Sequence, residues 1–421
     1  MPIERAALRK QKKRKIDTRR LALFCLFALA ALILPIHATL KNLNPSEPPP
    51  ADSVFAAAQP TPVPTPTPAP IGNDPADSAP PGGASAQKVS AAPSPARAPW
   101  ETAASVPTPA PTPVPRPENV VVTISAIGDC TIGFDEATGR QNRFDQVYLA
   151  NGSDPAYFFS NVKDILAADD LTIANLETTL TTAKKKAADK AFCFRGDPAY
   201  VRILEEGSVE AVNIANNHIY DYLQQGFDDT VATLEGSAVR YFGYDKYRVI
   251  EVRGVRVGLA GFHIGAGGWS GKKKAVETAI AALNAEADLV ILSFHWGIEG
   301  KYQPTGDQKS LARFAIDSGA DLVLGHHPHT LQGVETYNGR TVVYSLGNFC
   351  FGGNRNPKDK DSIILRQSFE FDGESFALLL AREPEIIPVS VSSVTDRNDY
   401  RPTRLEGESA ERALKKAAPV K

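Results

Sequence analysis

One long segment of the chain has a composition that cannot fold. From residue 41 to residue 118 the sequence is dominated by Pro, Ala, Ser and Thr, with runs such as TPVPTPTPAP and VPTPAPTPVP. Such sequence buries too little apolar surface to offset the entropy of ordering, and its prolines favour extended polyproline II. We therefore expect 41–118 to be a disordered Pro-rich stalk, which confines any globular fold in this chain of 421 residues to the part that follows.

The segment before the stalk joins a basic stretch to an apolar run. Residues 1–20 contain nine Lys or Arg against two acidic residues, and Leu21–Ile36 carries no charge. Extended to Leu40, this run is long enough as a helix to cross a bilayer. We therefore expect a single-pass signal-anchor over 21–40 in the cell membrane. Because basic residues that flank a membrane span stay on the cytoplasmic side, we expect a cytoplasmic N-terminus and an extracytoplasmic domain.

A cleaved signal peptide is the alternative to this anchor. Cleavage requires small residues in an A-x-A-like pattern after the apolar run. Only the weak sequence Ile36-His37-Ala38 follows here. The uncleaved anchor is therefore the preferred interpretation.

The net charge of the chain hides two regions of opposite sign. The total is −2 and residues 1–20 carry +7, which leaves −9 for the remainder. Binding to nucleic acid requires a basic face that neutralises phosphates. The acidic exterior part therefore argues against a nucleic-acid partner.

After the stalk, apolar strands alternate with amphipathic helices. Strands are predicted at 121–128, 171–175, 209–216, 249–262, 288–294, 320–325 and 341–347, and helices at 155–168, 198–207, 226–237, 275–286 and 306–319. This alternation predicts an α/β domain over 119–395 with a largely parallel, doubly covered sheet. After Asp361 only strands follow, which we expect to form an antiparallel part completing a second sheet. Residues 396–421 are predicted to be a loose polar tail.

Unusual polar residues follow most of these strands directly. They are Asp129, Asn175 with Glu177, Asn216 and Asn217 with His218 and Asp221, His295, and the group His326, His327 and His329. In an open α/β sheet the ligand site lies at the carboxyl ends of the strands, so we expect one shared site. Simpler interpretations exist for some of them: Asp129 as a helix cap, Asn175 and Glu177 as a polar turn, and His295 as a core residue.

The residue types at this site indicate a metal centre. Five of the seven His residues lie in the strand-end motifs, and three occur within four positions at 326–329. No CxxC or HExxH pattern occurs. Mixed oxygen and nitrogen ligands predict a catalytic site for one or two divalent ions such as Mn, Fe, Zn or Mg. His263, by contrast, is interpreted as structural.

The order of the motifs resembles that of a known family. The motifs are Gly128-Asp129, Asn175-Leu176-Glu177, Asn216-Asn217-His218, His295-Trp296-Gly297, Gly325-His326-His327-Pro328-His329 and Ser345-Leu346-Gly347-Asn348-Phe349. They resemble the capsule biosynthesis family associated with poly-γ-glutamate (CapA/PgsA type), within the calcineurin-like metallophosphoesterase superfamily. The resemblance runs from about Val121 to Phe351. It implies a four-layer αββα sandwich with a dinuclear metal site between its two sheets.

The resemblance also implies roles for single residues. The metal ligands would be Asp129, Glu177 (or Asn175) as the bridging group, Asn217, His295, His327 and His329. His218 would act near the leaving group, oriented by Asp221, and Asn175, His326 and Asn348 would lie near the metal or substrate. Arg195 is either a clamp for an anionic group or a surface arginine. One departure stands out: Thr131 occupies the position at which the superfamily's Asp-x-His motif has histidine.

These observations predict a membrane-anchored metallophosphoesterase-like hydrolase. The resemblance implies action in poly-γ-glutamate capsule or envelope polymer synthesis or export, on a phosphoester or an anionic polymer, with subunits of a polyglutamate synthase complex as partners. Two alternatives remain open: a non-hydrolytic metal-binding subunit of such a complex, and a phosphatase for another envelope metabolite.

Overall fold

A computed structural model describes residues 118–265 and 267–420. The predicted basic segment, the anchor at 21–40 and the stalk up to residue 117 lie outside these ranges. Within the described part of the chain, no helix combines the length and the apolar character that crossing a bilayer requires.

The larger sheet has nine strands and is built around β1 (Val120–Thr131). Its main order is β18 (Thr403–Arg404), β17 (Glu385–Ser390), β15 (Asp361–Phe371), β1, β3 (Leu171–Leu176), β6 (Ala211–Asn213) and β7 (Arg240–Phe242), while β14 (Asn348–Phe351) pairs with β1 and β16 (Leu378–Ala381) pairs with β15. β1, β3, β6 and β7 run parallel, whereas β15 is antiparallel to β1. The parallel half therefore ends at one common edge.

The second sheet has six strands. Its order is β12 (Leu331–Tyr337), β13 (Arg340–Leu346), β11 (Leu322–His326), β10 (Leu289–His295), β9 (Val255–His263) and β8 (Arg248–Val252). The four central strands are parallel, and the edge strands β12 and β8 are antiparallel to their neighbours. β10 is buried on both faces along its whole length, which explains its largely apolar sequence.

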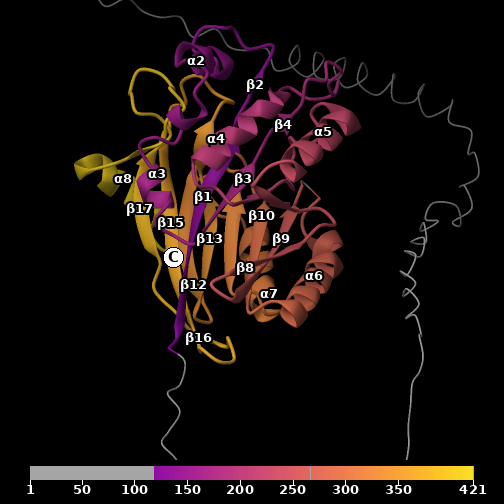
Figure 1. Ribbon diagram of the computed structural model, residues 1–421, viewed down its shortest axis with the longest axis vertical. Coiled ribbons are helices and arrows are strands. Elements are labelled where there is room, and N and C mark those ends of the chain that lie inside the picture. The colour runs from indigo at the N-terminus through magenta and orange to yellow at the C-terminus, as the bar shows by residue number, and fades with distance from the viewer. Residues whose placement is uncertain (1–117, 266, 421) are drawn as a thin grey trace, which may run out of the picture. The chain divides into compact units, whose positions relative to one another are not determined.

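Helices complete the domain. They are α2 (Phe144–Ala150), α3 (Lys163–Leu166), α4 (Val201–Glu206), α5 (Leu223–Glu235), α6 (Lys273–Glu286), α7 (Gly306–Asp317) and α8 (Gly407–Ala417), with 3₁₀ turns at Pro155–Tyr157, Pro198–Tyr200 and Ser270–Lys272. A small third sheet joins β2 (Phe134–Asp135), β5 (Phe194–Gly196) and β4 (Thr179–Leu180). Figure 1 shows the helices gathered around the two large sheets.

Three hydrophobic cores show how these elements stack. One core lies between the sheets, where Ile124 of β1 and Ile173 of β3 meet strands such as β10 through Ile291. A second core joins the outer face of the larger sheet to α2, α4 and α5, and a third joins the outer face of the second sheet to α6 and α7. The layers therefore run helix, sheet, sheet, helix, and the predicted mixed α/β fold is confirmed.

The C-terminal strands do not form part of a second sheet, contrary to the expectation from the sequence. β15 pairs with β1 over seven registered positions, from Val120 opposite Phe371 to Ala126 opposite Leu365. β1 has twelve residues and is paired with β3 on only one side, so its other edge needs a partner of similar length. β15 supplies that partner and therefore extends the first sheet.

The predicted loose tail from residue 396 is also wrong. Tyr400 is buried, and Asn398 donates hydrogen bonds to the carbonyls of Phe351 and Asn354. Beyond them α8 packs against β12, β15 and β17, so it closes the edge between the two sheets. The composition of α8 is polar because the residues it buries, Ala413 and Ala417, are small.

A buried carboxylate holds α8 in place. Arg412 donates two hydrogen bonds to Asp361, of 2.9 and 2.7 Å, and Lys416 lies 2.8 Å from the same carboxylate. Burial alone would raise the pKa of Asp361, but these two cations outweigh it and lower the pKa below its ordinary value of 3.8. The ionised Asp361 carboxylate, bound to Arg412 and Lys416, therefore stabilises the fold above about pH 4. This stabilisation is lost as the pH falls through the lowered pKa of Asp361.

We expect Asp361→Asn to lower the free energy of unfolding by about 1–2 kcal/mol at pH 7, because charged hydrogen bonds are lost while both cations stay partly exposed. Urea unfolding at pH 7 and below pH 4 measures this effect. Asp396→Asn is the control, since Asp396 is exposed and pairs only with its neighbour Arg397. Equal stability of the two variants at pH 7 would contradict the role given to Asp361.

Candidate metal centre

The strand ends of the two sheets place two rows of polar residues opposite each other. In the larger sheet Asp129 is in register with Asn175, and Asn175 is in register with Asn213. In the second sheet His295 is in register with both His263 and His326. Parallel strands thus bring residues that are far apart in sequence to one edge, as expected from the sequence.

A crossover of the chain joins the two rows. β13 belongs to the second sheet and β14 to the larger one, and only Gly347 separates them. Gly347 has a φ of +72°, and its carbonyl accepts a hydrogen bond of 2.9 Å from the Asp129 amide. The sheets are therefore tied together beside the first of the predicted ligands.

Asp129 is a fully buried carboxylate surrounded by donors. It accepts hydrogen bonds from the Asn175 side chain at 2.8 Å and from the His327 amide at 3.2 Å. His329 Nδ1 lies 3.3 Å away and His326 Nδ1 lies 3.4 Å away. Burial would raise the pKa of Asp129, but the imidazoles of His326 and His329 outweigh it, so the pKa is held well below its usual range.

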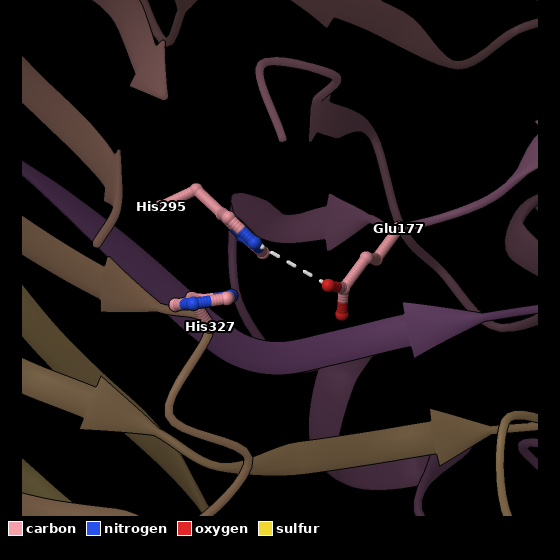
Figure 2. Close-up of side chains that lie close together, drawn as sticks. All are labelled: Glu177, His295 and His327. Atoms are coloured by element: carbon pink, nitrogen blue, oxygen red, sulfur yellow. Dashed lines mark ion pairs between the residues drawn. The ribbon is translucent and has the colours of Figure 1, made fainter. Parts of the chain in front are cut away.

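The carboxylate of Glu177, in contrast to that of Asp129, is buried without hydrogen-bond donors among the described residues. Its side chain has 0% exposure, and neither carboxylate oxygen has a hydrogen-bond partner within the described part of the chain. His295 Nε2 lies 3.3 Å from one oxygen (Figure 2), and His329 Nδ1 lies 3.8 Å from the other. Burial, with the charge of Asp129, raises the pKa of Glu177 well above its usual range. A buried carboxylate in this state calls for a compensating cation.

Three overlapping groups of side chains could hold such a cation. They are Glu177 with His295 and His327, Asp129 with Glu177 and His329, and Glu299 with His327 and His329; within each group the ligand atoms lie within 4.8 Å of one another. Asn217 Oδ1 is 2.6 Å from His295 Nε2 and adds an amide oxygen to the first group. The donors are oxygen and nitrogen without sulfur, which fits a divalent metal ion.

Two of the three histidines are in the neutral state that metal ligation requires. Burial and the neighbouring His327 lower the pKa of His295 well below its usual range, and burial and His329 lower the pKa of His327, so both rings are neutral. Burial would lower the pKa of His329 as well, but Glu177 and Asp129 raise it to about 10. The proton on His329 thus balances the buried carboxylates.

The backbone of residues 326–329, called the histidine segment below, is strained. His327 has a φ of +93° and His329 a φ of +56°, a backbone region that residues other than glycine rarely adopt. Asn348 holds His329 by accepting at 2.8 Å from Nδ1 and donating at 3.2 Å to its carbonyl. Strain of this kind persists where the surrounding structure enforces it, and it is typical of functional sites.

His218 lies beside the cluster and is paired with Asp221. Its Nδ1 is 2.6 Å from Asp221 Oδ2, and its ring packs against Phe194 with centroids 4.4 Å apart. The Phe194 amide and the Lys190 ammonium also donate to Asp221. Asn216 accepts a 3.0 Å hydrogen bond from the His218 amide, so this residue orders the loop rather than facing the metal groups.

The remaining predicted residues differ in their positions. His326 is fully buried, and neither ring nitrogen has a hydrogen-bond partner within residues 118–265 and 267–420. Asn175 lies at the centre of the cluster, between Asp129 and His295, whose Nδ1 is 3.2 Å away. Arg195 is on β5, where it pairs with Glu136 and donates at 3.0 Å to the carbonyl of Ala183. The Arg195 side chain is only 12% exposed and is held by residues next to the small sheet, away from the metal groups, so it does not match the alternative of a surface arginine.

Sequence reasoning misses two residues near the site. His263 is interpreted as structural from its sequence, yet its ring lies 5.7 Å from that of His295, and burial with the nearby imidazole of His327 lowers its pKa to about 4. Its position at a strand end is the signal that could have found it. Glu299, in the loop after His295, belongs to the third ligand group. No strand-end pattern marks it.

A cavity of about 710 Å³ opens beside the histidines. His263 and His327 line it together with Trp296, Thr305 and Leu311. It combines apolar walls with a few polar groups next to the cluster, which is the usual composition of a substrate pocket.

Fold and site together define a mixed α/β protein with a buried histidine and carboxylate cluster at the edges of two sheets. Residues 123–353 match the family described as "Bacterial capsule synthesis protein PGA_cap". This match covers more than half of the chain, and the chain belongs to that family. The predicted resemblance to the CapA/PgsA type is confirmed.

Similar proteins carry related names. The chain is 29% identical over 296 residues to the PGA biosynthesis protein CapA of Bacillus subtilis strain 168, covering 65% of this chain and 73% of that one. It is 29% identical over 307 residues to the capsule biosynthesis protein CapA of Bacillus anthracis, covering 67% and 72%. A probable polyglutamine synthesis accessory protein of Mycobacterium tuberculosis is 30% identical over 210 residues, covering 43% and 55%.

Solved structures with some likeness are more distant. A crystal structure titled as a novel phosphatase, from Mycoplasma pneumoniae, has a TM-score of 0.41 and 14% identity, covering 64% of this chain and 95% of that one. A hypothetical protein from Thermus thermophilus has a TM-score of 0.37 and 17% identity, covering 63% and 99%. Nothing about activity follows from likenesses this remote.

The close approach of the crossover to β1 gives a test of the site's geometry. A Cβ at position 128 would lie 2.1 Å from the Gly347 carbonyl oxygen, so Gly128→Ala must shift the backbone that carries Asp129. We expect a loss of about 1–3 kcal/mol in unfolding free energy, with weaker Mn²⁺ binding. Urea unfolding and calorimetric titration measure both quantities.

Gly139→Ala is the control for this substitution. Its Cβ would meet only the Arg355 guanidinium, at an ordinary 3.6 Å. We expect its stability to stay within about 0.5 kcal/mol of the unaltered chain. If Gly128→Ala behaved like this control in both measurements, the crossover would not position Asp129.

Proposed function

We propose that the chain is a metal-dependent phosphoesterase-like hydrolase of the calcineurin-like type, acting in capsule polymer synthesis. One observation carries the proposal: the Glu177 carboxylate, fully buried and without a hydrogen-bond partner among the described residues, faces His295 and His327 from the opposite sheet. A metal held there would be shared by both sheets. The layer order of the fold, with ligands from both sheets at one edge, supports the same assignment.

The residues divide into two sets of ligands that share Glu177. Asn217, His295 and His327 would hold one ion with Glu177, and Asp129 and His329 would hold a second. When bound, divalent ions supply Lewis-acid polarisation of a phosphoryl oxygen and activation of the attacking water. Asn175 fixes the Asp129 carboxylate through its 2.8 Å hydrogen bond, and Asn348 fixes His329.

His218 is placed to handle the proton of the leaving group. Asp221 holds Nδ1 at 2.6 Å, which fixes the ring and leaves Nε2 to donate a proton to a departing oxygen. Asp221 is itself held by the Phe194 amide at 2.6 Å and by Lys190. This pairing supports the proposed role of His218 as the general acid.

The names of the relatives are the basis for the biological role that we propose. Two relatives are named for capsule or PGA biosynthesis, and a third is named an accessory protein of polyglutamine synthesis. We propose that this chain acts beside a polymer synthase complex, on an anionic polymer or a phosphoester linked to its synthesis or export. The cavity beside His263 and His327 would receive that substrate.

One specific observation favours a second function. The Thr131 hydroxyl donates to the Glu177 carbonyl at 3.1 Å, so this position cannot supply the ligand that histidine gives in the superfamily. A second ion held by fewer ligands would bind more weakly. The domain would then serve as a metal-binding subunit of the synthase complex without hydrolysis.

The test uses the purified full chain in detergent. Metal content is measured after loading with Mn²⁺, and phosphomonoesters and phosphodiesters are assayed. We expect His295→Ala to lose both metal and turnover, because it removes a ligand. We expect His218→Ala to keep the metal and lose at least about 100-fold in turnover, as the loss of a general acid does.

Two outcomes would decide against the proposal. Stoichiometric metal without turnover on any phosphoester would favour the non-hydrolytic subunit. A chain that binds no divalent ion would remove the basis for both functions.

We also propose that residues 21–40 anchor the chain in the cell membrane, with the domain outside and 41–118 as its stalk. We expect the full chain to stay in the membrane fraction after an alkaline wash, and a chain lacking residues 1–40 to be released. Fractionation of expressing cells measures this. Release of both chains, or a mature N-terminus after Ala38 by mass spectrometry, would contradict the anchor.

A further inference from the structure

The loop that follows His295 is bonded to the histidine segment at several points. The Trp296 amide donates to the His326 carbonyl at 3.0 Å, and the Gly300 amide donates to the Pro328 carbonyl at 2.8 Å. The carbonyl of Lys301 accepts from Thr330 at 2.9 Å and from Gln332 at 2.8 Å. These bonds bracket Glu299, so its backbone is held against the strained turn that carries His327 and His329.

Glu299 faces the cluster from the solvent side. Its carboxylate forms one ligand group with His327 and His329, with the ligand atoms within 4.8 Å of one another. His327 belongs to the inner group built on His295, and His329 to the inner group built on Asp129. Glu299 is exposed, whereas the shared carboxylate of Glu177 is buried. The two carboxylates therefore lie on opposite sides of the same histidine pair.

The inner group of Asp129, Glu177 and His329 is short of one ligand. The Thr131 side chain bonds to the backbone of Glu177 and offers no imidazole. An ion with three protein ligands would leave much of its coordination to water. Glu299 has no hydrogen bond or ion pair within the described ranges that would hold it away from this group.

We propose that Glu299 is a further ligand of the metal centre, closing its solvent side together with His327 and His329. The inference rests on the proposed metal-dependent function. The partners of Glu299 in this ligand set are His327 and His329, each of which also belongs to an inner group that contains Glu177. A third ligand of the carboxylate type adds an oxygen donor to these two imidazoles, which suits a divalent ion.

An exposed carboxylate near histidines is also common without a metal. Asp307 allows the two cases to be compared, because it lies in the first turn of α7 and on the wall of the cavity that His327 lines. Asp307 is exposed like Glu299 but belongs to no ligand group within the described residues. A general effect of negative charge near the site would thus appear in both residues, and ligation only in Glu299.

The experiment titrates Mn²⁺ into the metal-free full chain in detergent, by calorimetry and by electron paramagnetic resonance. We expect the unaltered chain to bind two Mn²⁺ with a spin-coupled spectrum. Glu299→Gln should bind the first ion normally and the second at least about tenfold more weakly, with loss of the coupling. Glu299→Asp should recover part of the affinity, and Asp307→Asn should match the unaltered chain.

The outcomes separate this inference from the proposed function. Two tightly bound and coupled ions in Glu299→Gln would overturn the role of Glu299 and leave the metal centre intact. A single ion in both the unaltered chain and Glu299→Gln would do the same. Equal weakening in Glu299→Gln and Asp307→Asn would reduce the effect to charge, and no Mn²⁺ in any chain would overturn both proposals.

Discussion

The rest of the structure depends on a carboxylate that is buried without a hydrogen bond. An ionised carboxylate taken out of water costs several kcal/mol unless it is paired or coordinates a cation, and for this reason burial raises the pKa of Glu177. Among the described residues neither Glu177 oxygen has a hydrogen-bond partner, although ring nitrogens of His295 and His329 lie at 3.3 and 3.8 Å. A divalent ion bound to Glu177 would offset the free energy that burying this carboxylate costs, and the buried group therefore indicates a metal site.

The two-sheet architecture explains how the ligands meet. Each sheet ends its parallel strands at one edge, with Asp129 and Asn175 on one side and His295 and His326 on the other. The crossover at Gly347 fixes the distance between those edges through its bond to the Asp129 amide. The strained turn at His327 and His329 then directs two more imidazoles into the gap. Neither sheet alone could assemble the cluster.

Much of this arrangement could be predicted from the sequence, because it follows from local patterns. Buried parallel strands such as β10 are continuous apolar runs, and the polar residue that ends each run marks the site. The cluster of His326, His327 and His329 is evident for the same reason. These patterns could not predict which strand pairs with the free edge of another strand. The pairing of β15 with β1 depends on which edge is free, a property of the assembled sheet.

The other differences have similar causes. The sequence of α8 predicts a tail because its buried residues are alanines, and the helix is held by the charges of Asp361, Arg412 and Lys416 rather than by a broad apolar face. Glu299 lies in a loop whose course is set by bonds to a distant segment, so its distance to His327 could not be inferred from spacing. His263 shows the strand-end signal but lacks neighbouring polar residues that would give it weight.

The most direct test of the metal centre is anomalous diffraction from crystals of the chain grown with Mn²⁺, measured at the manganese edge. We predict a strong anomalous peak between Glu177, Asn217, His295 and His327, within bonding distance of a Glu177 oxygen. An ordered site without such a peak, with the Glu177 carboxylate bonded instead to a protein group or a water, would contradict the assignment.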